Sequence, residues 1–251
     1  GGGAVLVILD LTELRRLERV RKDFVANVEH ELRTPVAVIQ TSSEVLVTHA
    51  GLSGKPLELV EAIHRHAERL GGLIASLLEL SRLEAGKHET LLAPLRIAPV
   101  VEKSLLLCRE QMNTAGVTVH NECPDHIEVI GDHQALERVL VNLLDNAMKY
   151  GGQTIWLRTV VTAGHVEVSI EDDGPGIEVR HQSRLFERFY RVDRGRSRDR
   201  GGSGLGLAIV KHLGQAMGGN VRFEERMPNG SRFVISLCPA EHDQPGADRN
   251  D

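Results

Sequence analysis

The sequence predicts a multidomain protein: an all-α helical hairpin, which forms a four-helix bundle in a dimer, followed by an α+β two-layer sandwich. From about Glu13 to Ala85 the apolar residues recur almost wholly with a helical period. The stretch HAGLSGKP, His49 to Pro56, separates two helical runs and has the Gly and Pro content of a turn. After Gly86, strand runs alternate with helices without regular βαβ spacing, which favours a layered α+β sandwich.

The expected boundaries follow these changes of pattern. Residues 1–12 are interpreted as the end of a truncated upstream domain, because they hold a β-rich run and begin GGG without an initiator Met. Residues 13–86 form the hairpin, 87–98 a Pro-containing linker and 99–240 the sandwich. The polar tail, residues 241–251, is expected to be disordered.

Composition excludes several classes of protein. A formal net charge of −5 argues against a general nucleic-acid binder, which usually carries a basic excess. The three cysteines are odd in number and lack metal-ligand spacing, which favours a reducing compartment over a disulfide framework. No apolar run approaches the roughly 20 residues of a membrane span.

The second helix of the hairpin carries a coiled-coil-like apolar seam. Its members recur at spacings of mostly three and four: Leu59, Ile63, Leu70, Leu73, Leu77 and Leu80. A hairpin of two helices leaves one long apolar edge exposed. Pairing of two hairpins in a homodimer covers that edge and gives the four-helix bundle.

The first helix contains FVANVEHELRTPV, Phe24 to Val36, where a histidine and a proline lie close together. At roughly 100° per residue the apolar residues form a stripe, and His30 falls opposite its centre. Pro35 cannot donate to the carbonyl of Glu31, so we expect a bend beside His30. On this stretch alone, a solvent-exposed histidine on a kinked amphipathic helix is the alternative.

The sandwich is expected to contain these elements in order: strands VTVHNEC and IEVIGD, a helix after the N-cap Asp132, antiparallel strands TIWLRTVV and HVEVSIEDDG, a helix opening near Gly204, and strands NVRFEE and SRFVISLC. The helix segment NLLDNAMKY places Asn142, Asn146 and Lys149 on one face. Two amide oxygens and an ammonium group suit a hydrated Mg²⁺ and the phosphates that it bridges. A solvated polar face is the alternative.

The strand HVEVSIEDDGPGI ends in a carboxylate. Its alternation carries Asp172 onto the buried face, where a carboxylate needs hydrogen-bond donors such as the amino group of a ligand. Gly174 and Gly176 allow the backbone to turn sharply beside that ligand. The alternative is an aspartate that bonds the amides of its own turn.

A glycine cluster, GGSGLGLAIV, leads into the later helix and suits a phosphate, because free N–H groups and the helix dipole face the anion. It is neither a Walker A loop nor a Rossmann fingerprint. The preceding arginine-rich stretch is either a lid over a triphosphate or a solvated loop; it contains Arg191, Arg194, Arg196, Arg198 and Arg200. In LFERFYR, Phe186 and Phe189 form a hydrophobic foot, with Arg188 and Arg191 as candidate phosphate contacts.

Taken together, HELRTP, NLLDNAMKY, DDGPGI, FERFYR and GSGLGL occur in the order found in sensor histidine kinases of bacterial two-component systems, and the chain resembles that family from about Arg21 onward. RKDFVANVEHELRTP and LFERFYRVDRGRSRD are most similar to the phosphate-regulon-type members, and the opening VLVILDLTELRRLERV resembles the end of a PAS domain. The chain departs from the family at Glu29, usually a small Ser, and at the two glycines after Tyr150, usually Ser or Thr with Pro.

The resemblance implies a dimerisation and phosphotransfer hairpin followed by a catalytic ATP-binding domain. It implies that His30 accepts the γ-phosphoryl of ATP, Glu31 takes a ring proton, and Thr34 orients water for dephosphorylating a response regulator. ATP and Mg²⁺ are the implied cofactors, with Asn142 and Asn146 as metal ligands. The implied nucleotide contacts are Asn142, Asn146, Lys149, Tyr150, Asp172, Gly174, Gly176, Ile177, Arg188, Arg191, Gly202, Gly204, Leu205 and Gly206.

The implied partners are a response-regulator receiver domain and a second copy of the chain, with no nucleic acid. Membrane contact is expected only through a missing upstream region, so the chain would be the cytoplasmic portion of an inner-membrane-anchored bacterial sensor. A gyrase-like, chaperone-like or mismatch-repair ATPase on the same fold is disfavoured, because those proteins have no place for the HELRTP hairpin. A non-catalytic, ATP-binding dimeric signalling scaffold remains the alternative.

Overall fold

The structure is a computed structural model that describes residues 32, 34–46, 56–84, 90–162, 164–192 and 202–240. The chain divides into two compact units, Gly1–Ile74 and Ala75–Asp251. His30, Glu31 and the arginines from Arg194 to Arg200 lie outside the described residues.

The described part of residues 32–84 is helical, as predicted. Residues 34–46 form one helix and α2 spans Pro56–Glu84. Along α2 the seam residues Leu73 and Leu80 are buried, whereas Ile74 and Leu78 are 44% and 55% exposed in the single chain. An exposed apolar edge of this kind is the surface that the expected pairing of two hairpins would cover.

A mixed sheet forms the centre of the second unit. Its strands are β2 (Thr118–Glu122), β4 (Thr154–Thr162), β5 (His165–Asp172), β7 (Ser231–Leu237) and β6 (Asn220–Glu225), in that spatial order. Strands β2 and β4 are parallel, and the remaining neighbours are antiparallel. A separate antiparallel pair joins β1 (Ala93–Arg96) to β3 (Glu128–Gly131).

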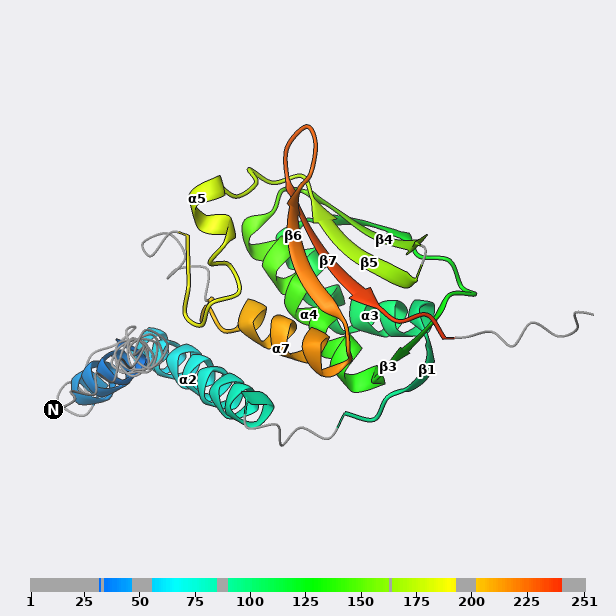
Figure 1. Cartoon of the computed structure of the whole chain (residues 1–251). Helices are drawn as coiled ribbons and strands as arrows, with labels where there is room; N and C mark the ends of the chain where they lie inside the picture. The colour runs from blue at the N-terminus through cyan, green and yellow to red at the C-terminus, as the bar shows by residue number, and fades with distance from the viewer. Residues whose placement is uncertain are drawn as a thin grey trace, which may run out of the picture. The chain divides into compact units, whose positions relative to one another are not determined.

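Three helices lie on one face of this sheet (Figure 1): α3 (Ile97–Ala115), α4 (His133–Tyr150) and α7 (Gly206–Ala216). A fourth, α5 (Val179–Gln182), is a single short turn. The core lies between the layers, where Leu136, Val139 and Leu143 of α4 are fully buried together with the inward residues of β5. The α+β two-layer sandwich is therefore confirmed. Strands β2 to β7 and helices α4 and α7 fall where the sequence predicts them, whereas β1, α3 and α5 were not predicted.

The segment expected to be a linker, residues 87–98, contains structure of its own. Ala93–Arg96 forms β1, and α3 begins at Ile97, whose amide donates to the carbonyl of Ile127 over 3.1 Å. Helix α3 buries Val100, Val101 and Cys108, yet Leu106 and Leu107 on the same helix are 65% and 54% exposed. Apolar residues on both faces blur the helical period, which explains why the sequence alone does not reveal α3.

The structure shows two further features. Cys108, Cys123 and Cys238 are all free thiols. None of the helices in the described part of the chain combines the length and the hydrophobicity needed to span a bilayer.

Asp132 is the N-cap of α4, as predicted. Its contribution to stability can be tested by substitution. Its Oδ1 accepts hydrogen bonds from the amides of Gln134 and Ala135 at 2.8 and 2.9 Å, and its Oδ2 accepts from the amide of Leu91 at 2.8 Å. We expect Asp132→Ala to lower the free energy of unfolding by about 1–2 kcal/mol in urea denaturation, because the capping acceptors are lost. Asp132→Asn keeps one acceptor oxygen and should lose less; equal losses for both variants would contradict the capping role.

Candidate functional site

The predicted site centres on the carboxylate at the end of β5. Val168, Ile170 and Asp172 share the inner face of the strand and are 1%, 2% and 3% exposed, as the alternation predicts. The Asp172 Oδ1 accepts from the amide of Gly174 at 2.8 Å and from the amide of Ser231 at 3.3 Å. The bond to Gly174 is the local turn considered as an alternative, so Asp172 is held by its own turn and by a distant strand together.

Burial also affects the pKa of this carboxylate. Desolvation raises the pKa of Asp172 above its ordinary value, and the hydrogen bonds from Gly174 and Ser231 oppose that rise. An ionised carboxylate here therefore gains from any further donor that approaches it. The arrangement suits a ligand that presents an N–H group to Asp172.

Glycine backbone packs directly around Asp172. A Cβ on Gly151 would lie 2.8 Å from the Asp172 Cβ, and a Cβ on Gly174 would lie 2.7 Å from the Gly151 Cα. Gly230, with φ of +130°, approaches so closely that a Cβ there would overlap the Asp172 carbonyl oxygen. The glycine at position 151, a departure from the family pattern, thus matches a close approach that a side chain would block.

The polar face of α4 lies beside the start of α7. The Asn142 Nδ2 donates to the carbonyl of Arg138 over 2.9 Å, and a Cβ on Gly206 would lie 3.1 Å from the Asn142 Oδ1. The donor end of this amide is used within the helix, and its oxygen faces α7. Asn146 is half-buried one turn later, and the Lys149 Nζ bonds the Asp145 carboxylate at 2.7 Å.

The glycine cluster and the hydrophobic foot are joined. The amide of Phe189 donates to the carbonyl of Gly204 over 2.8 Å, and Phe189 is buried with φ of 58°. Phe186 packs edge-on against Phe233, with ring centroids 6.4 Å apart. A Cβ on Gly202 would overlap the Tyr150 hydroxyl, so the described start of the cluster lies against the end of α4.

Three further predicted residues are placed as follows. Leu205 is fully buried at the N-cap of α7, and Ile177 is half-buried beyond the β5 turn. Arg188 forms an ion pair with Glu84, whose carboxylate also lies 3.6 Å from the His212 Nε2. Burial lowers the pKa of His212, and the charge of Glu84 opposes that change. Arg188, expected at a phosphate, thus has a carboxylate partner in this structure.

Sequence reasoning missed Gly230 and Ser231. Ser231 is the strand partner of Asp172 although 59 residues separate them, and its amide bonds the carboxylate. The signal that could have found them is the Asn229–Gly230 dipeptide between two strand runs, which is typical of a hairpin turn. That signal locates the turn but not its contact with Asp172.

The side chains of the site also indicate which kind of metal ion it could bind. Among the described residues, no group of three or more His, Cys, Asp or Glu side chains is placed to hold a metal ion. The Asn142 oxygen that faces α7 suits Mg²⁺, which needs few protein oxygens and keeps water and ligand phosphates in its shell.

Comparisons with known proteins agree with this geometry. Residues 131–241 match the family described as histidine kinase-, DNA gyrase B- and HSP90-like ATPase, and residues 20–86 match the His Kinase A (phospho-acceptor) domain. The chain is 35% identical over 236 residues to the sensor-like histidine kinase SenX3 of Mycobacterium tuberculosis, covering 93% of this chain and 58% of the relative. The chain therefore spans little more than half the length of that relative.

Solved structures give the same result. The mycobacterial sensor histidine kinase MprB is 31% identical, with a TM-score of 0.52 over 61% of this chain and 100% of that one. The histidine kinase ThkA, solved in complex with the response regulator protein TrrA, is 22% identical, with a TM-score of 0.71 over 93% of this chain and 69% of that one. The ThkA likeness supports the fold. On the two domain matches and the identity to MprB, the chain belongs to the sensor histidine kinases.

Proposed function

We propose that this chain is the core of an ATP-dependent protein-histidine kinase that phosphorylates its own His30 and passes the phosphoryl group to an aspartate of a response regulator. The observation that carries the proposal is the pairing of two features in one chain. HELRTP lies within the phospho-acceptor domain match, and a separate sandwich gathers Asp172, Asn142 and close-packed glycines. Dephosphorylation of the same regulator is part of the proposal.

In the nucleotide site, Asp172 accepts from the exocyclic amine of adenine, and the glycine backbone at Gly174 and Gly176 packs against the base. Asn142 and Asn146 would hold Mg²⁺, which neutralises phosphate charge when bound. Lys149, Arg188 and the start of α7 would face the phosphates. Because Lys149 and Arg188 have carboxylate partners in this structure, they would have to exchange Asp145 and Glu84 for phosphate. The other proposed contacts are Tyr150, Ile177, Arg191, Gly202, Gly204, Leu205 and Gly206.

In the transfer step, a neutral ring nitrogen of His30 attacks the γ-phosphorus while the bond to the β–γ bridging oxygen breaks and ADP leaves. An imidazole with an ordinary pKa near 6.5 is largely neutral at pH 7. Glu31 takes the proton from the other ring nitrogen, so the phosphorylated ring carries no excess charge. Positioning and charge neutralisation supply most of the rate in such transfers.

The proposed partners are a response-regulator receiver domain and a second copy of this chain. The exposed edge of α2, including Ile74 and Leu78, is an apolar surface that pairing would bury. We also propose that the chain is the cytoplasmic portion of a sensor anchored in the inner membrane by an upstream region, and that it binds no nucleic acid.

His30→Gln tests the phosphoacceptor. We expect the variant to incorporate no acid-labile, alkali-stable label from γ-labelled ATP, because glutamine keeps the bulk of the side chain without its nucleophilic nitrogen. Its affinity for ADP, measured by calorimetry, should stay unchanged, because His30 lies outside the sandwich. Label retained by the variant would overturn the assignment, and a wild-type protein that binds ATP without labelling would favour a non-catalytic scaffold.

Asp172→Asn tests the adenine contact. We expect ADP affinity to fall about 10- to 100-fold, because a hydrogen bond to a charged acceptor is lost. Burial raises the pKa of Asp172 in the folded state above its value in the unfolded chain. Ionisation of Asp172 therefore lowers the free energy of unfolding. This loss appears as the pH rises from the unfolded pKa through the folded pKa, and it remains at higher pH. The nucleotide-free variant should therefore be at least as stable as wild type at pH 7 by thermal denaturation. Unchanged ADP affinity would remove Asp172 from the site.

Thr34→Ala separates a structural role from a role in dephosphorylation. Thr34 is half-buried in the helix that spans residues 34–46. We expect near-normal autophosphorylation and transfer, while phosphorylated regulator persists on the order of 100-fold longer with kinase and ADP, because an oriented hydroxyl no longer positions water. Parallel losses of stability and of all activities would instead mark Thr34 as structural support.

A further inference from the structure

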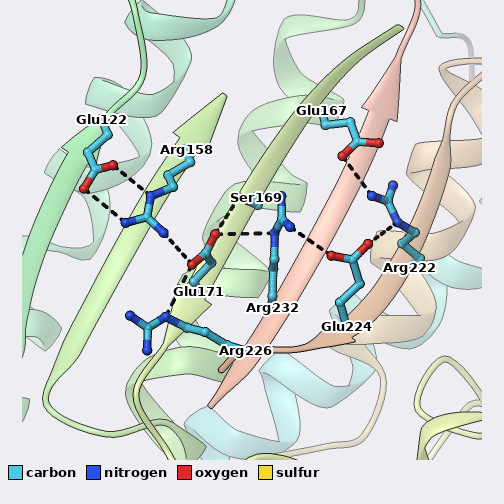
Figure 2. Close-up of polar contacts among 9 residues, drawn as sticks. All are labelled: Glu122, Arg158, Glu167, Ser169, Glu171, Arg222, Glu224, Arg226 and Arg232. Atoms are coloured by element: carbon cyan, nitrogen blue, oxygen red, sulfur yellow. Dashed lines mark hydrogen bonds and ion pairs between the residues drawn. The ribbon is translucent and has the colours of Figure 1, made fainter. Parts of the chain in front are cut away.

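Two consecutive residues of β5 point to opposite faces of the sheet. Asp172 faces the helices and the proposed adenine site, whereas Glu171 lies on the face that carries no helix. Glu171 is nevertheless only 5% exposed. Long arginine side chains converge on it from three other segments, as Figure 2 shows.

Glu171 has one short charged hydrogen bond and three longer polar contacts. Its Oε2 accepts from the Arg158 Nη1 of β4 at 2.8 Å, and its Oε1 accepts from the Ser169 hydroxyl at 3.3 Å. The Nε atoms of Arg226 and Arg232 each lie 3.4 Å from a Glu171 oxygen. Both Nε atoms are buried and make no hydrogen bond, so the charge of Glu171 is their compensation at this position.

Arg226 and Arg232 stand at the two ends of the β6–β7 turn. The Arg226 amide donates to the carbonyl of Gly230 over 3.2 Å, and its Nη1 donates to the carbonyl of Asn229 over 3.4 Å. Its guanidinium also stacks on Trp156, 3.9 Å from the ring centroid. Arg232 directly follows Ser231 in β7 and is the strand partner of Glu171. The Glu171 carboxylate therefore contacts arginines at both ends of the turn.

The same turn holds the site residue on the other face. Ser231 donates its amide to the Asp172 carboxylate, and Gly230 packs on the Asp172 carbonyl. Any shift of the turn moves the Ser231 amide and the Gly230 backbone relative to Asp172, because Gly230 is already in close contact with Asp172. The outer face of the sheet is thus mechanically connected to the inner one through five residues of turn.

We propose that Glu171 is a positioning residue for nucleotide recognition: with Arg158, Arg226 and Arg232 it forms a clamp that seats the β6–β7 turn on Asp172. The Glu171 clamp rests on the proposed function, since it acts through the adenine contact of Asp172. Its work is geometric, and no atom of the clamp touches the nucleotide.

The chain offers a matched control on the same strand. Glu167 also points outward from β5, and its carboxylate accepts from the Arg222 Nη2 at 2.8 Å. Both glutamates belong to one run of ion pairs, which continues through Arg232, Glu224 and Arg222. Glu167 lies about 16 Å from Asp172 along the strand. Loss of its charge breaks the same network at its far end and leaves the contacts of Glu171 with Arg226 and Arg232 in place.

The test compares Glu171→Gln with Glu167→Gln in the full chain. Calorimetry with ADP should show about tenfold weaker binding for Glu171→Gln only, at the lower end of coupling between distinct sites. The preference for ADP over GDP should narrow in the same variant, because a misplaced Asp172 discriminates less between an amine and a carbonyl at that position of the base. A change that only destabilises the fold would lower the affinities for ADP and for GDP by the same factor.

A second measurement needs no nucleotide. Hydrogen exchange at the amides of Gly174 and Ser231 should quicken in Glu171→Gln but not in Glu167→Gln, since both amides bond Asp172. If Glu171→Gln does not fold, Arg226→Met takes its place, because it removes the Arg226 contacts with Glu171 and with the Asn229 carbonyl but leaves the Arg158 and Arg232 contacts of Glu171. Arg222→Met is its control.

The outcomes are distinct. Equal ADP affinity and equal exchange in the Glu171 and Glu167 variants would overturn the clamp while leaving the proposed function intact. Wild-type protein that binds no ADP would overturn the proposed function and the recognition role of the clamp with it. Selective loss of adenine preference in Glu171→Gln or Arg226→Met, with faster exchange at Ser231, would support the clamp.

Discussion

The nucleotide half of this protein is organised around one desolvated carboxylate. Asp172 sits at the buried end of β5, where a charge is costly unless backbone amides reach it. Two amides do so, from Gly174 and Ser231, and both require main chain to pass within hydrogen-bond distance. The end of α4, the β5 turn and the β6–β7 turn converge because of this requirement, and their glycines follow from the crowding.

The same burial lets the ionised Asp172 carboxylate gain from any further hydrogen-bond donor. Burial raises the pKa of Asp172, so the carboxylate is incompletely compensated by the protein alone. A ligand that supplies one more hydrogen-bond donor would stabilise the ionised carboxylate. In the proposed function, the preference for an amine at one position of the base would follow from this packing.

Local signals account for what could be predicted from the sequence. The alternation in β5 places Asp172 inward, the Asp132 cap marks the start of α4, and the helical period puts Asn142 and Asn146 on one face. These features depend on residues within one or two turns of each other, so a linear pattern contains them. The helix over residues 34–46 belongs to the same class, whereas the prediction for His30 falls outside the described residues.

Contacts between distant segments account for the features that could not be predicted from the sequence. Strand β1 exists because it pairs with β3, more than 30 residues later, and its own sequence carries no strong strand signal. Ser231 reaches Asp172 only through the register of β5 and β7, and Glu171 gains its arginines from β4 and from the β6–β7 turn. The carboxylate partners of Lys149 and Arg188 likewise follow from packing, which the motifs alone do not specify.

The strand order has a consequence for how the protein is made. Strand β7 is the last to be synthesised, yet it lies inside the sheet, between β5 and β6. A nascent chain that ends before residue 231 has β5 and β6 without the strand that joins them, and Asp172 without one of its amides. Helices form locally and early, whereas this joining strand closes a long-range pairing. During translation the N-terminal helices can thus form while the sheet still lacks its joining strand, so the two parts of the chain become structured at different times.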